Sequence, residues 1–482
     1  MQKISKVCKY LLCILPLTLF FSYFPLIKLG ENETMYFELS LPLIWLALFD
    51  ILGLVFVVLK YRREIFTKIF GSVLWWLFPI FVTFSVIWSL NHLRGVLTVG
   101  VMWAVFFAVL FFYEMRENLD AKFFRVFLKW FFGAALFVCF WCVLQCVLDV
   151  FGVSQDATLL CDGCVYQMFG FPHPNGFAIE PQFMGNLLLA PALLAMYLFV
   201  SKKDKKYLLL FAVFVATLFL TMSRGAIYAC VVGLIFLDFF MWARAKKSEK
   251  KVVCKDIMKT VGVFVVSFVF TLNLQGVLAA SSPTSDTYFD GVAKVVNQLS
   301  LGIIDLRGAG NEFTGGETSG NEPVENSSAS VENLGKTEAV LDGYVAESTD
   351  TRVRLVRAAL DIWKKDFKTI AVGVGIGGAG QALYDNGLSP APREIVQNEY
   401  ASLLLETGLI GVVLFVVLLV MAVKVFLKSP NAGLLLGLMV SYGVSLLFFS
   451  GLTNALQIVL LPGILVLFPD VLVLFSKNKK QN

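Results

Sequence analysis

Charged residues are scarce in this sequence. Lysine, arginine, aspartate and glutamate together make up only 16% of the 482 residues, whereas hydrophobic residues make up 58%. The mean hydropathy is +0.76. This composition excludes an ordinary soluble globular protein and indicates an integral membrane protein.

Potential metal ligands are equally few. The chain has two histidines, His92 and His173, and nine scattered cysteines, so no cluster of His and Cys has zinc-type spacing. We therefore expect neither a metal centre nor a cofactor. Cys161 and Cys164, in the loop sequence "CDGC", are compatible with a disulfide, with two free thiols, or with a tight turn of no functional weight.

One stretch matches a nucleotide-binding sequence pattern but lacks the secondary structure that the motif requires. Gly373, Gly375 and Gly378 in "GVGIGG" match G-x-G-x-x-G. The segment before them has the pattern of an amphipathic helix and no βαβ unit surrounds them, whereas the dinucleotide motif requires a strand before it and a helix after it. We interpret this stretch as a flexible turn.

Long apolar runs fill most of the chain. Runs of about 18 to 25 residues are long enough to cross a hydrocarbon layer of roughly 30 Å as helices. We expect an all-α integral membrane fold with about twelve membrane-spanning helices, nine within residues 1–280 and three within residues 400–482. The expected spans are 10–28, 36–59, 70–90, 93–113, 126–149, 173–200, 207–222, 225–243, 258–278, 400–423, 432–450 and 454–475. No small-residue cleavage site follows the first run, so we expect a retained helix and not a signal peptide.

The basic residues are distributed unevenly between alternate loops. Of the 40 lysines and arginines, 27 lie in or near the segments on one side of the expected membrane, and three lie in the opposing short loops. The other ten lie in the long loop 279–399 on the sparse side, and long loops translocate largely regardless of charge. We therefore expect both termini in the cytoplasm and the long loop outside. The net charge of +5 reflects this asymmetry and favours anionic lipid, not nucleic acid, as a partner.

The long external loop changes character along its length. Residues 281–349 are rich in Gly, Ser, Asn and Glu, which is the composition of a flexible tether. Residues 350–399 contain the Gly-rich turn and, before it, an amphipathic helix with an apolar stripe expected at Val353, Val356, Leu360, Trp363 and Phe367. Its basic residues lie mostly off this stripe. This pattern suits a membrane surface or an anionic ligand, and the alternative is a solvated charged face on a packed helix.

Several polar residues are expected at the outer edge of the membrane. An ionisable residue inside a span costs about 3 kcal/mol on insertion scales, so it normally faces a cavity or a partner. We expect His173 and Glu180, seven residues apart, on one face of the sixth span, with a kink at Pro181. Arg224 lies in the tight external turn "TMSRGA", and its guanidinium suits phosphate oxygens. The plainer interpretations are a snorkelling arginine, a buried hydrogen bond for Glu180 and a helix cap for His173.

Four stretches of the sequence carry a family resemblance. They are "HPNGFAIEPQFMGNLLLAP", "LTMSRGAIYACVVGLI", "DTRVRLVRAALDIWKKDFKTIAVGVGIGG" and "QNEYASLLLETGLIGVVLF". They resemble the O-antigen ligases and polymerases, bacterial membrane glycosyltransferases that act on glycans linked to undecaprenyl diphosphate. The resemblance covers most of residues 165–425. It implies a GT-C-type helical fold that needs no metal, with a large external loop between late spans.

The resemblance also implies roles for particular residues. The family's arginine at the edge of a span falls on Arg224, and its loop arginine falls on Arg352, with Arg354 as the near alternative. Both arginines would bind the diphosphate of the lipid-linked donor. Where the family commonly has His-Asn, this chain has Gln397 followed by Asn398. Glutamine can position a sugar but cannot accept a proton at physiological pH.

The general base is therefore expected at another residue. Glu399, Glu180 and His173 are the available bases. Glu180 is favoured among them because burial raises the pKa of a carboxyl towards the working pH.

The function implied by the resemblance is glycosyl transfer at the outer, periplasmic face of the cytoplasmic (inner) membrane. Polymerisation or ligation of undecaprenyl-diphosphate-linked glycans, as in O-antigen and lipopolysaccharide synthesis, is expected, and Gln397 favours a polymerase slightly. The expected partners are this donor, a glycan or lipid-linked acceptor, the lipid bilayer and other polysaccharide-assembly proteins. Two other classes stay open. One is a polysaccharide transporter or flippase, although no internal repeat is evident, and the other is an inactive scaffold of a glycan assembly complex.

Overall fold

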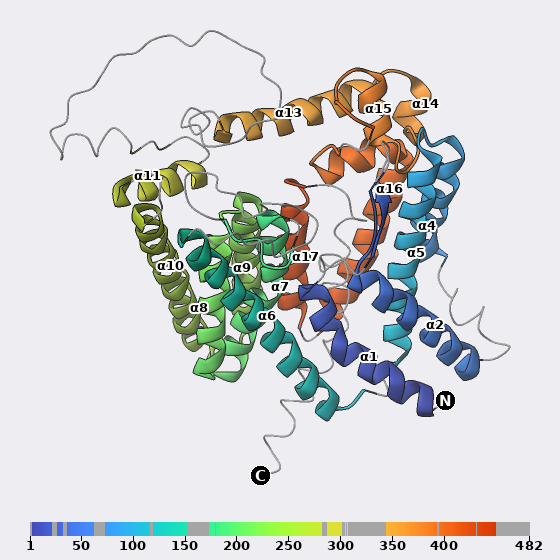
Figure 1. Ribbon diagram of the computed structural model, residues 1–482. Coiled ribbons are helices and arrows are strands. Elements are labelled where there is room, and N and C mark those ends of the chain that lie inside the picture. Colours follow the sequence, from blue (N-terminus) through green and yellow to red (C-terminus); the bar gives the residue numbers. More distant parts are fainter. Residues whose placement is uncertain are drawn as a thin grey trace, which may run out of the picture.

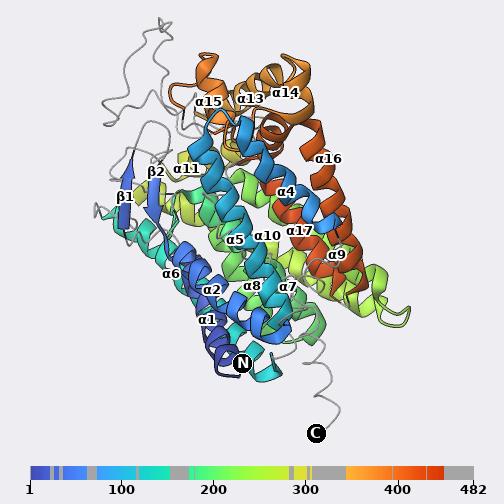
Figure 2. The same ribbon diagram turned by 90° about the vertical axis from the view of Figure 1, so that its right-hand side faces the viewer.

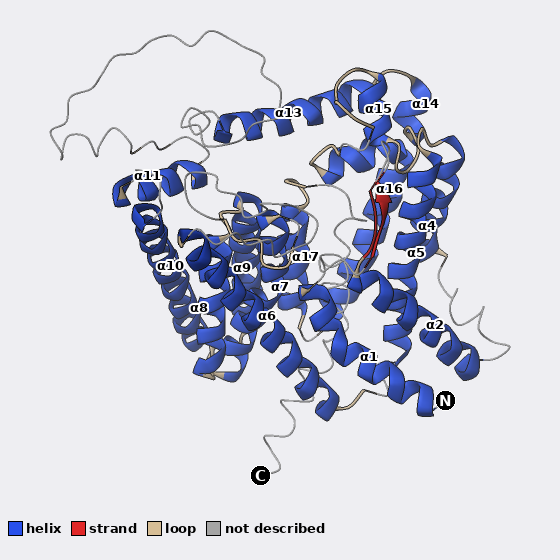
Figure 3. Ribbon diagram, in the orientation of Figure 1, coloured by secondary structure: helices blue, strands red, loops and turns tan. Residues whose placement is uncertain are grey.

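The structure is a computed structural model that describes residues 2–21, 27–31, 36–61, 73–115, 119–151, 173–178, 180–281, 287–300, 304, 306, 344–392, 395–429 and 431–449. The helices of the bundle are α1 (Gln2–Phe20), α2 (Leu41–Tyr61), α4 (Leu74–Ser85) with the 3-10 helix η2 (Val86–Trp88), α5 (His92–Met115), α6 (Ala121–Val150), α7 (Pro181–Lys202), α8 (Lys205–Leu220), α9 (Arg224–Arg244), α10 (Lys250–Ser281), α16 (Glu399–Lys428) and α17 (Ala432–Ser445). Four more helices, α11 (Tyr288–Leu299), α13 (Tyr344–Trp363), α14 (Phe367–Val372) and α15 (Ala379–Asp385), belong to the long loop. The strands β1 (Ile27–Glu31) and β2 (Tyr36–Leu39) form an antiparallel hairpin, and the rest of the described secondary structure is helical (Figure 3).

Within the described residues, seven helices are long and apolar enough to cross a membrane, namely α2, α5, α6, α7, α9, α10 and α16. Residues 74–88 and 432–445 form shorter apolar helices. A multi-pass, predominantly helical membrane protein is therefore confirmed. The count of twelve spans stays a prediction, and the expected span 454–475 lies outside the described residues, as do Cys161 and Cys164.

The boundaries predicted for the first two spans are wrong. The first helix occupies residues 2–20, and residues 27–31 and 36–39 are the two strands, with Lys28 paired to Glu38. Each of these charged residues has an apolar residue on either side in the chain, which is the alternation of a strand and not of a helix. The predicted spans included parts of the two strands, because they were placed by the number of apolar residues and not by this alternation.

The centre of the bundle is α7. Of its most apolar window, 94% is buried, and it packs against α8, α9 and α17. Gly185 permits the closest approach, since a Cβ at this position would lie 2.8 Å from the Cβ of Ala226 in α9. A helix that is enclosed on all sides has no polar face. Because α7 is packed in this way, it is a firm support for the residues at its two ends.

One end of the bundle is covered by α13, α14 and α15 (Figure 1). We call it the loop end. Part of the tether predicted for residues 281–349 is helical, because α11 and the first residues of α13 lie within it. The remainder of that range lies outside the described residues, apart from residue 281, the residues that flank α11, and residues 304 and 306.

The apolar stripe predicted for α13 is only partly right, since Val356 and Trp363 are partly buried against the core but the fully buried face lies beside the predicted one. The buried residues, which pack in one hydrophobic cluster with residues of α15 and α16, are Leu355, Ala358, Ala359 and Ile362. By contrast, Val353 is 38% exposed and Phe367, which begins α14, is 84% exposed. Steps of three and four residues fit both stripes, and packing against α15 and α16 selects one of them. The basic residues Arg354 and Arg357 lie on the exposed side.

The turn at residues 373–378 is packed, not flexible as predicted. The Gly375 N–H donates to the Glu406 carbonyl at 2.9 Å, and Ser89 Oγ donates to the Ile376 carbonyl at 2.8 Å. Gly375 has φ 89°, and a Cβ there would lie 2.3 Å from the Cα of Ser89. The glycines therefore let the turn fit between the η2–α5 connection and α16, on the face where α4, α5 and α16 lie side by side (Figure 2). Their spacing reflects this packing.

Helix α16 is broken at Gly408, which has φ 63° and ψ −170°. The break allows close packing, since a Cβ at Gly408 would lie 2.5 Å from the carbonyl carbon of Ala371 in α14. Residues 399–407 form a short helix that carries the polar side chains, and residues 409–428 form the apolar part. The polar start of this apolar run therefore belongs to the loop end.

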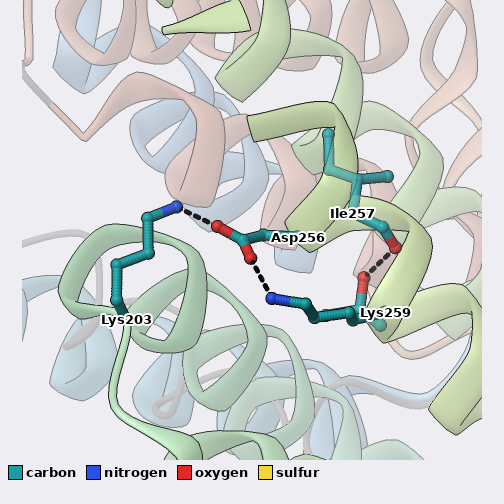
Figure 4. Close-up of polar contacts among 5 residues, drawn as sticks. Lys203, Asp256, Ile257 and Lys259 are labelled. Atoms are coloured by element: carbon teal, nitrogen blue, oxygen red, sulfur yellow. Dashed lines mark hydrogen bonds and ion pairs between the residues drawn. The ribbon is translucent and has the colours of Figure 1, made fainter. Parts of the chain in front are cut away.

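The opposite end of the bundle gathers basic residues. Lys203 and Lys259 both bind the carboxylate of Asp256, which is 4% exposed, and Lys259 Nζ lies 2.8 Å from Asp256 Oδ1 (Figure 4). These contacts join the α7–α8 turn to α10. Arg244, the last residue of α9, donates to the Ser429 carbonyl between α16 and α17 at 2.9 Å. Loops that charge counting assigned to one side thus lie at one end, although the side of the membrane that this end faces stays a prediction.

Candidate functional site at the loop end

Arg352 of α13 is held by two glutamines at the loop end. Its Nε donates to Oε1 of Gln397 at 3.2 Å, and its Nη2 donates to Oε1 of Gln182 at 3.4 Å. Nε2 of Gln182 in turn donates to the Phe448 carbonyl at 2.8 Å. These residues come from α13, α7, the residue pair before α16 and the segment after α17. Three distant parts of the chain therefore meet at one guanidinium, and a fourth is joined to them through Gln182.

Glu180 lies beside this group. It is the N-cap residue of α7, with extended backbone, and Pro181 begins the helix. Burial raises the pKa of the Glu180 carboxyl, and the positive charge of Arg352 partly opposes this rise. A carboxyl whose pKa is raised in this way is suited to take up and release a proton.

The predicted pairing of His173 with Glu180 on one helical face is wrong. Residues 173–178 are not helical, and Pro181 starts α7 where a kink was predicted, because proline is well suited to the first position of a helix. His173 is 3% exposed. Its segment is anchored on α6, where the Gly176 N–H donates to Oε1 of Gln145 at 2.9 Å.

The segment 446–449, directly after α17, supports the start of α16. The Glu399 N–H donates to the Leu446 carbonyl at 2.9 Å, and Nδ2 of Asn398 donates to the Leu447 carbonyl at 3.0 Å. Asn398 also caps α16, since its Oδ1 accepts from the Ala401 N–H at 3.0 Å. Asn398 and Glu399 are thus bound to the same segment as Gln182.

Arg224 is the first residue of α9 and is 7% exposed. Its neighbour Gly225 lies against Phe448, because a Cβ at position 225 would lie 2.7 Å from the Cβ of Phe448. On its other side, α9 packs on α7 at Gly185. Phe448 therefore contacts both the start of α9, through its side chain, and Gln182, through its carbonyl.

Three helices thus begin around the segment 446–449. They are α7, α9 and α16. The N-terminus of a helix presents unpaired backbone N–H groups and the positive end of the helix dipole, and both favour anions. Together with two arginines, these helix starts make the loop end suited to a multiply charged anion such as a diphosphate.

Arg352 fits this place better than its alternative. Arg354 is exposed, and two residues correspond to about 200° around a helix, so the two side chains leave α13 on different sides. Glu399, in the first turn of α16, is half-buried. The structure therefore brings together Arg352, Gln397 and Glu180, with the backbone of Glu399 and the start of α9 bound to the same supporting segment.

Gln397 has an uncommon backbone conformation, with φ 57°. The left-handed region costs a residue other than glycine about 1–2 kcal/mol, and such strain is found at functional sites that hold it in place. Here the capped start of α16 follows directly, and the Gln397 side chain accepts from Arg352.

Gln182 and Phe448 were not among the residues predicted from the sequence. Gln182 is the polar residue two positions after Glu180 in a stretch that is otherwise apolar, and this was the available signal. Phe448 acts through its carbonyl and its contact with Gly225, for which its side-chain type gives no signal. Among the described residues, no group of three or more His, Cys, Asp and Glu side chains is placed to hold a metal ion.

The chain is similar to a known protein family over part of its length. Residues 207–416 match the family model described as O-antigen ligase. The matched range includes Arg224, the loop helix with Arg352, the packed Gly-rich turn and Gln397. No curated protein matches the chain. This match covers 210 of the 482 residues and supports the resemblance of the sequence to the O-antigen ligases and polymerases.

Proposed function

We propose that the protein is a membrane glycosyltransferase that polymerises or ligates glycans carried on undecaprenyl diphosphate, at the outer face of the cytoplasmic membrane. The observation that carries this proposal is the meeting of Arg352, Gln397 and Glu180 beside the starts of α7, α9 and α16. The family match supports membrane glycan ligation or polymerisation in general. Synthesis of O-antigen or a related surface polysaccharide is the proposed setting.

The proposed reaction is an inverting glycosyl transfer. An acceptor hydroxyl oxygen attacks the anomeric carbon of the donor glycan, the bond from that carbon to the diphosphate oxygen breaks, and the bonding electron pair leaves with the lipid diphosphate. Arg224 and Arg352 stabilise the negative charge that develops on this leaving group, an electrostatic contribution that is often the largest in catalysis. The step needs a base for the hydroxyl proton.

Glu180 is the proposed base. Its raised pKa and its place beside Arg352 support this assignment over Glu399 and His173, which stay the alternatives. Gln397 cannot take the proton, but its amide can orient a sugar hydroxyl while its oxygen accepts from Arg352. A site that combines a base at the start of α7 with two cations does not require a histidine at position 397.

The test uses the purified protein with a lipid-linked oligosaccharide donor. Substituting Arg224→Ala or Arg352→Ala is expected to lower the rate of transfer by about 100-fold or more, as is typical for the loss of a group that stabilises transition-state charge. Arg354→Ala, two residues further along α13, is the matched control and is expected to keep near wild-type activity.

Product length gives the readout. Elongated or transferred glycan from the wild type, and its loss in the two variants, supports the proposal. Full transfer by Arg224→Ala, or a wild type that moves the intact lipid-linked donor across a bilayer without forming a glycosidic bond, refutes it. The second outcome would favour a transporter.

A further inference from the structure

Gln182 contacts both sides of the proposed site at once. Its Oε1 accepts from Arg352 at 3.4 Å and its Nε2 donates to the Phe448 carbonyl at 2.8 Å. An arginine only donates hydrogen bonds and a carbonyl only accepts them. The amide oxygen of Gln182 must therefore face Arg352, and the amide nitrogen must face the Phe448 carbonyl. The side chain of Gln182 therefore has a single orientation that satisfies both contacts.

The support behind Gln182 is rigid. It is the second residue of α7, the most enclosed helix of the bundle. Arg352, by contrast, is on a loop helix that packs on α15 and α16 at the loop end. The contact between them links the loop to the most enclosed of the candidate membrane-spanning helices, and a site built on such an element is held more precisely than one built on a loop.

The second contact of Gln182 leads to the other arginine. The Phe448 residue that accepts from Gln182 also lies against Gly225, next to Arg224. Gln182 is thus one hydrogen bond from Arg352 and is joined, through one residue, to the start of α9. A displacement of its amide would change the spacing between the two arginines.

The chemistry of an amide matters here. Gln182 and Gln397 are both neutral, so they orient the guanidinium of Arg352 without cancelling its charge. A glutamate at position 182 would bind the guanidinium more strongly, because hydrogen bonds between ionised groups are roughly twice as strong as neutral ones. It would also oppose the binding of a diphosphate.

We propose that Gln182 is a positioning residue that holds Arg352 in register with Arg224 for the diphosphate of the lipid-linked donor. This inference rests on the proposed function. Gln182 acts through Arg352 and not on the reacting atoms, so its contribution disappears when Arg352 is absent.

The test is a double-mutant cycle on binding of undecaprenyl diphosphate to the full-length protein in detergent. Gln182→Leu keeps the approximate size and removes both hydrogen bonds, and we expect it to weaken binding about tenfold, as is typical for loss of a hydrogen bond to a charged group. In the Arg352→Ala background the same substitution should have no further effect. Gln182→Glu should also weaken binding although it keeps an acceptor for Arg352.

Two controls separate positioning from folding. Gln381→Leu removes an amide on α15 that donates to Asp385 at 2.8 Å, and it should leave binding unchanged. Thermal unfolding in detergent should show that Gln182→Leu and Gln182→Glu are folded. In steady-state assays, Gln182→Leu should raise the KM for the donor and leave the KM for the acceptor unchanged.

The outcomes distinguish this inference from the function on which it rests. Equal binding by the wild type and Gln182→Leu, or full additivity with Arg352→Ala, overturns the positioning role alone, as does wild-type binding by Gln182→Glu. A wild type that neither binds undecaprenyl diphosphate nor transfers glycan overturns the proposed function and the inference with it.

Discussion

Glu180 shows how one carboxyl can be placed between two opposing influences. Burial makes its charged form less favourable, while Arg352 favours it, and the net effect is a raised pKa. In an enzyme that transfers a proton from a hydroxyl, a base of this kind is more effective than a fully solvated carboxylate.

The pH dependence of transfer tests this role. A base acts only when deprotonated, so the rate should be full above the raised pKa of Glu180 and should fall as the pH decreases through it. The positive charge of Arg352 lowers the pKa of Glu180, so the substitution Arg352→Gln should raise that pKa further. As the pH decreases, the residual activity of Arg352→Gln should therefore begin to fall at a higher pH than the activity of the wild type. Rate profiles over pH for the two proteins provide the measurement, and identical acidic limbs would contradict the assignment.

The direct substitution is Glu180→Gln, which keeps size and removes the base. It is expected to lower kcat by about 100-fold or more, the usual contribution of general base catalysis. Glu399→Gln serves as the comparison, since Glu399 is the alternative base at the start of α16. If Glu399→Gln is the inactive variant and Glu180→Gln is active, the roles of the two carboxyls are exchanged.

Among the elements, the turn at residues 373–378 packs directly against the backbone of its neighbours. Gly375→Ala would place a Cβ 2.3 Å from the Cα of Ser89, and neither backbone can move freely. We expect this substitution to destabilise the docking of α14 and α15 by about 3 kcal/mol, in the upper range for overpacking. Limited proteolysis of the loop, which should become faster, is the measurement.

Gly387→Ala is the matched control. Gly387 also has a left-handed backbone, with φ 68°, but its Cβ would meet nothing within 4 Å. It shares the conformational strain of Gly375→Ala without the clash. Equal proteolysis rates for the two variants would show that packing against Ser89 does not hold the loop.

Some elements could be predicted from the sequence, and the reasons are physical. The length of an apolar run predicts most of the bundle, because crossing a membrane requires a minimum length. The start of α7 could not be predicted, since Pro181 fits both a kink and a first helical position. The buried face of α13 could not be predicted either, because its two adjoining apolar stripes have the same period and α15 and α16 decide between them.

In the candidate site too, some residues could be predicted from the sequence and others could not. Arg352 and Gln397 were identified from the resemblance of short stretches, and the structure brings them together at 3.2 Å. The link from Gln182 to the Phe448 carbonyl joins residues that are far apart in the chain and depends on the packing of α7 against α17. No local pattern contains that information.

At the scale of the whole molecule, the two ends of the bundle differ in chemistry. The loop end holds the arginines of the candidate site, and the opposite end holds the basic turns around Asp256. The rule for basic residues predicts that the second end faces the cytoplasm. The loop end would then face the compartment where lipid-linked glycans are exposed.

Cysteine labelling in intact cells tests this orientation. In a chain with its nine native cysteines replaced, Leu388→Cys and Lys247→Cys place single thiols at exposed positions near α15 and between α9 and α10. A membrane-impermeant reagent should label position 388 from outside and position 247 only after lysis. Labelling of both from one side, or of position 247 alone in intact cells, would reverse or reject the topology.

The break at Gly408 makes the start of α16 a separate short unit. Gln397 stands just before a helical stretch of about two and a half turns that ends at this break, and the Gly-rich turn is bonded to its far end through Glu406. The Gly-rich turn and the Gln397 amide are therefore attached to the two ends of one short helix. Packing of the turn against α5 and α16 consequently helps to set the position of the amide oxygen that accepts from Arg352.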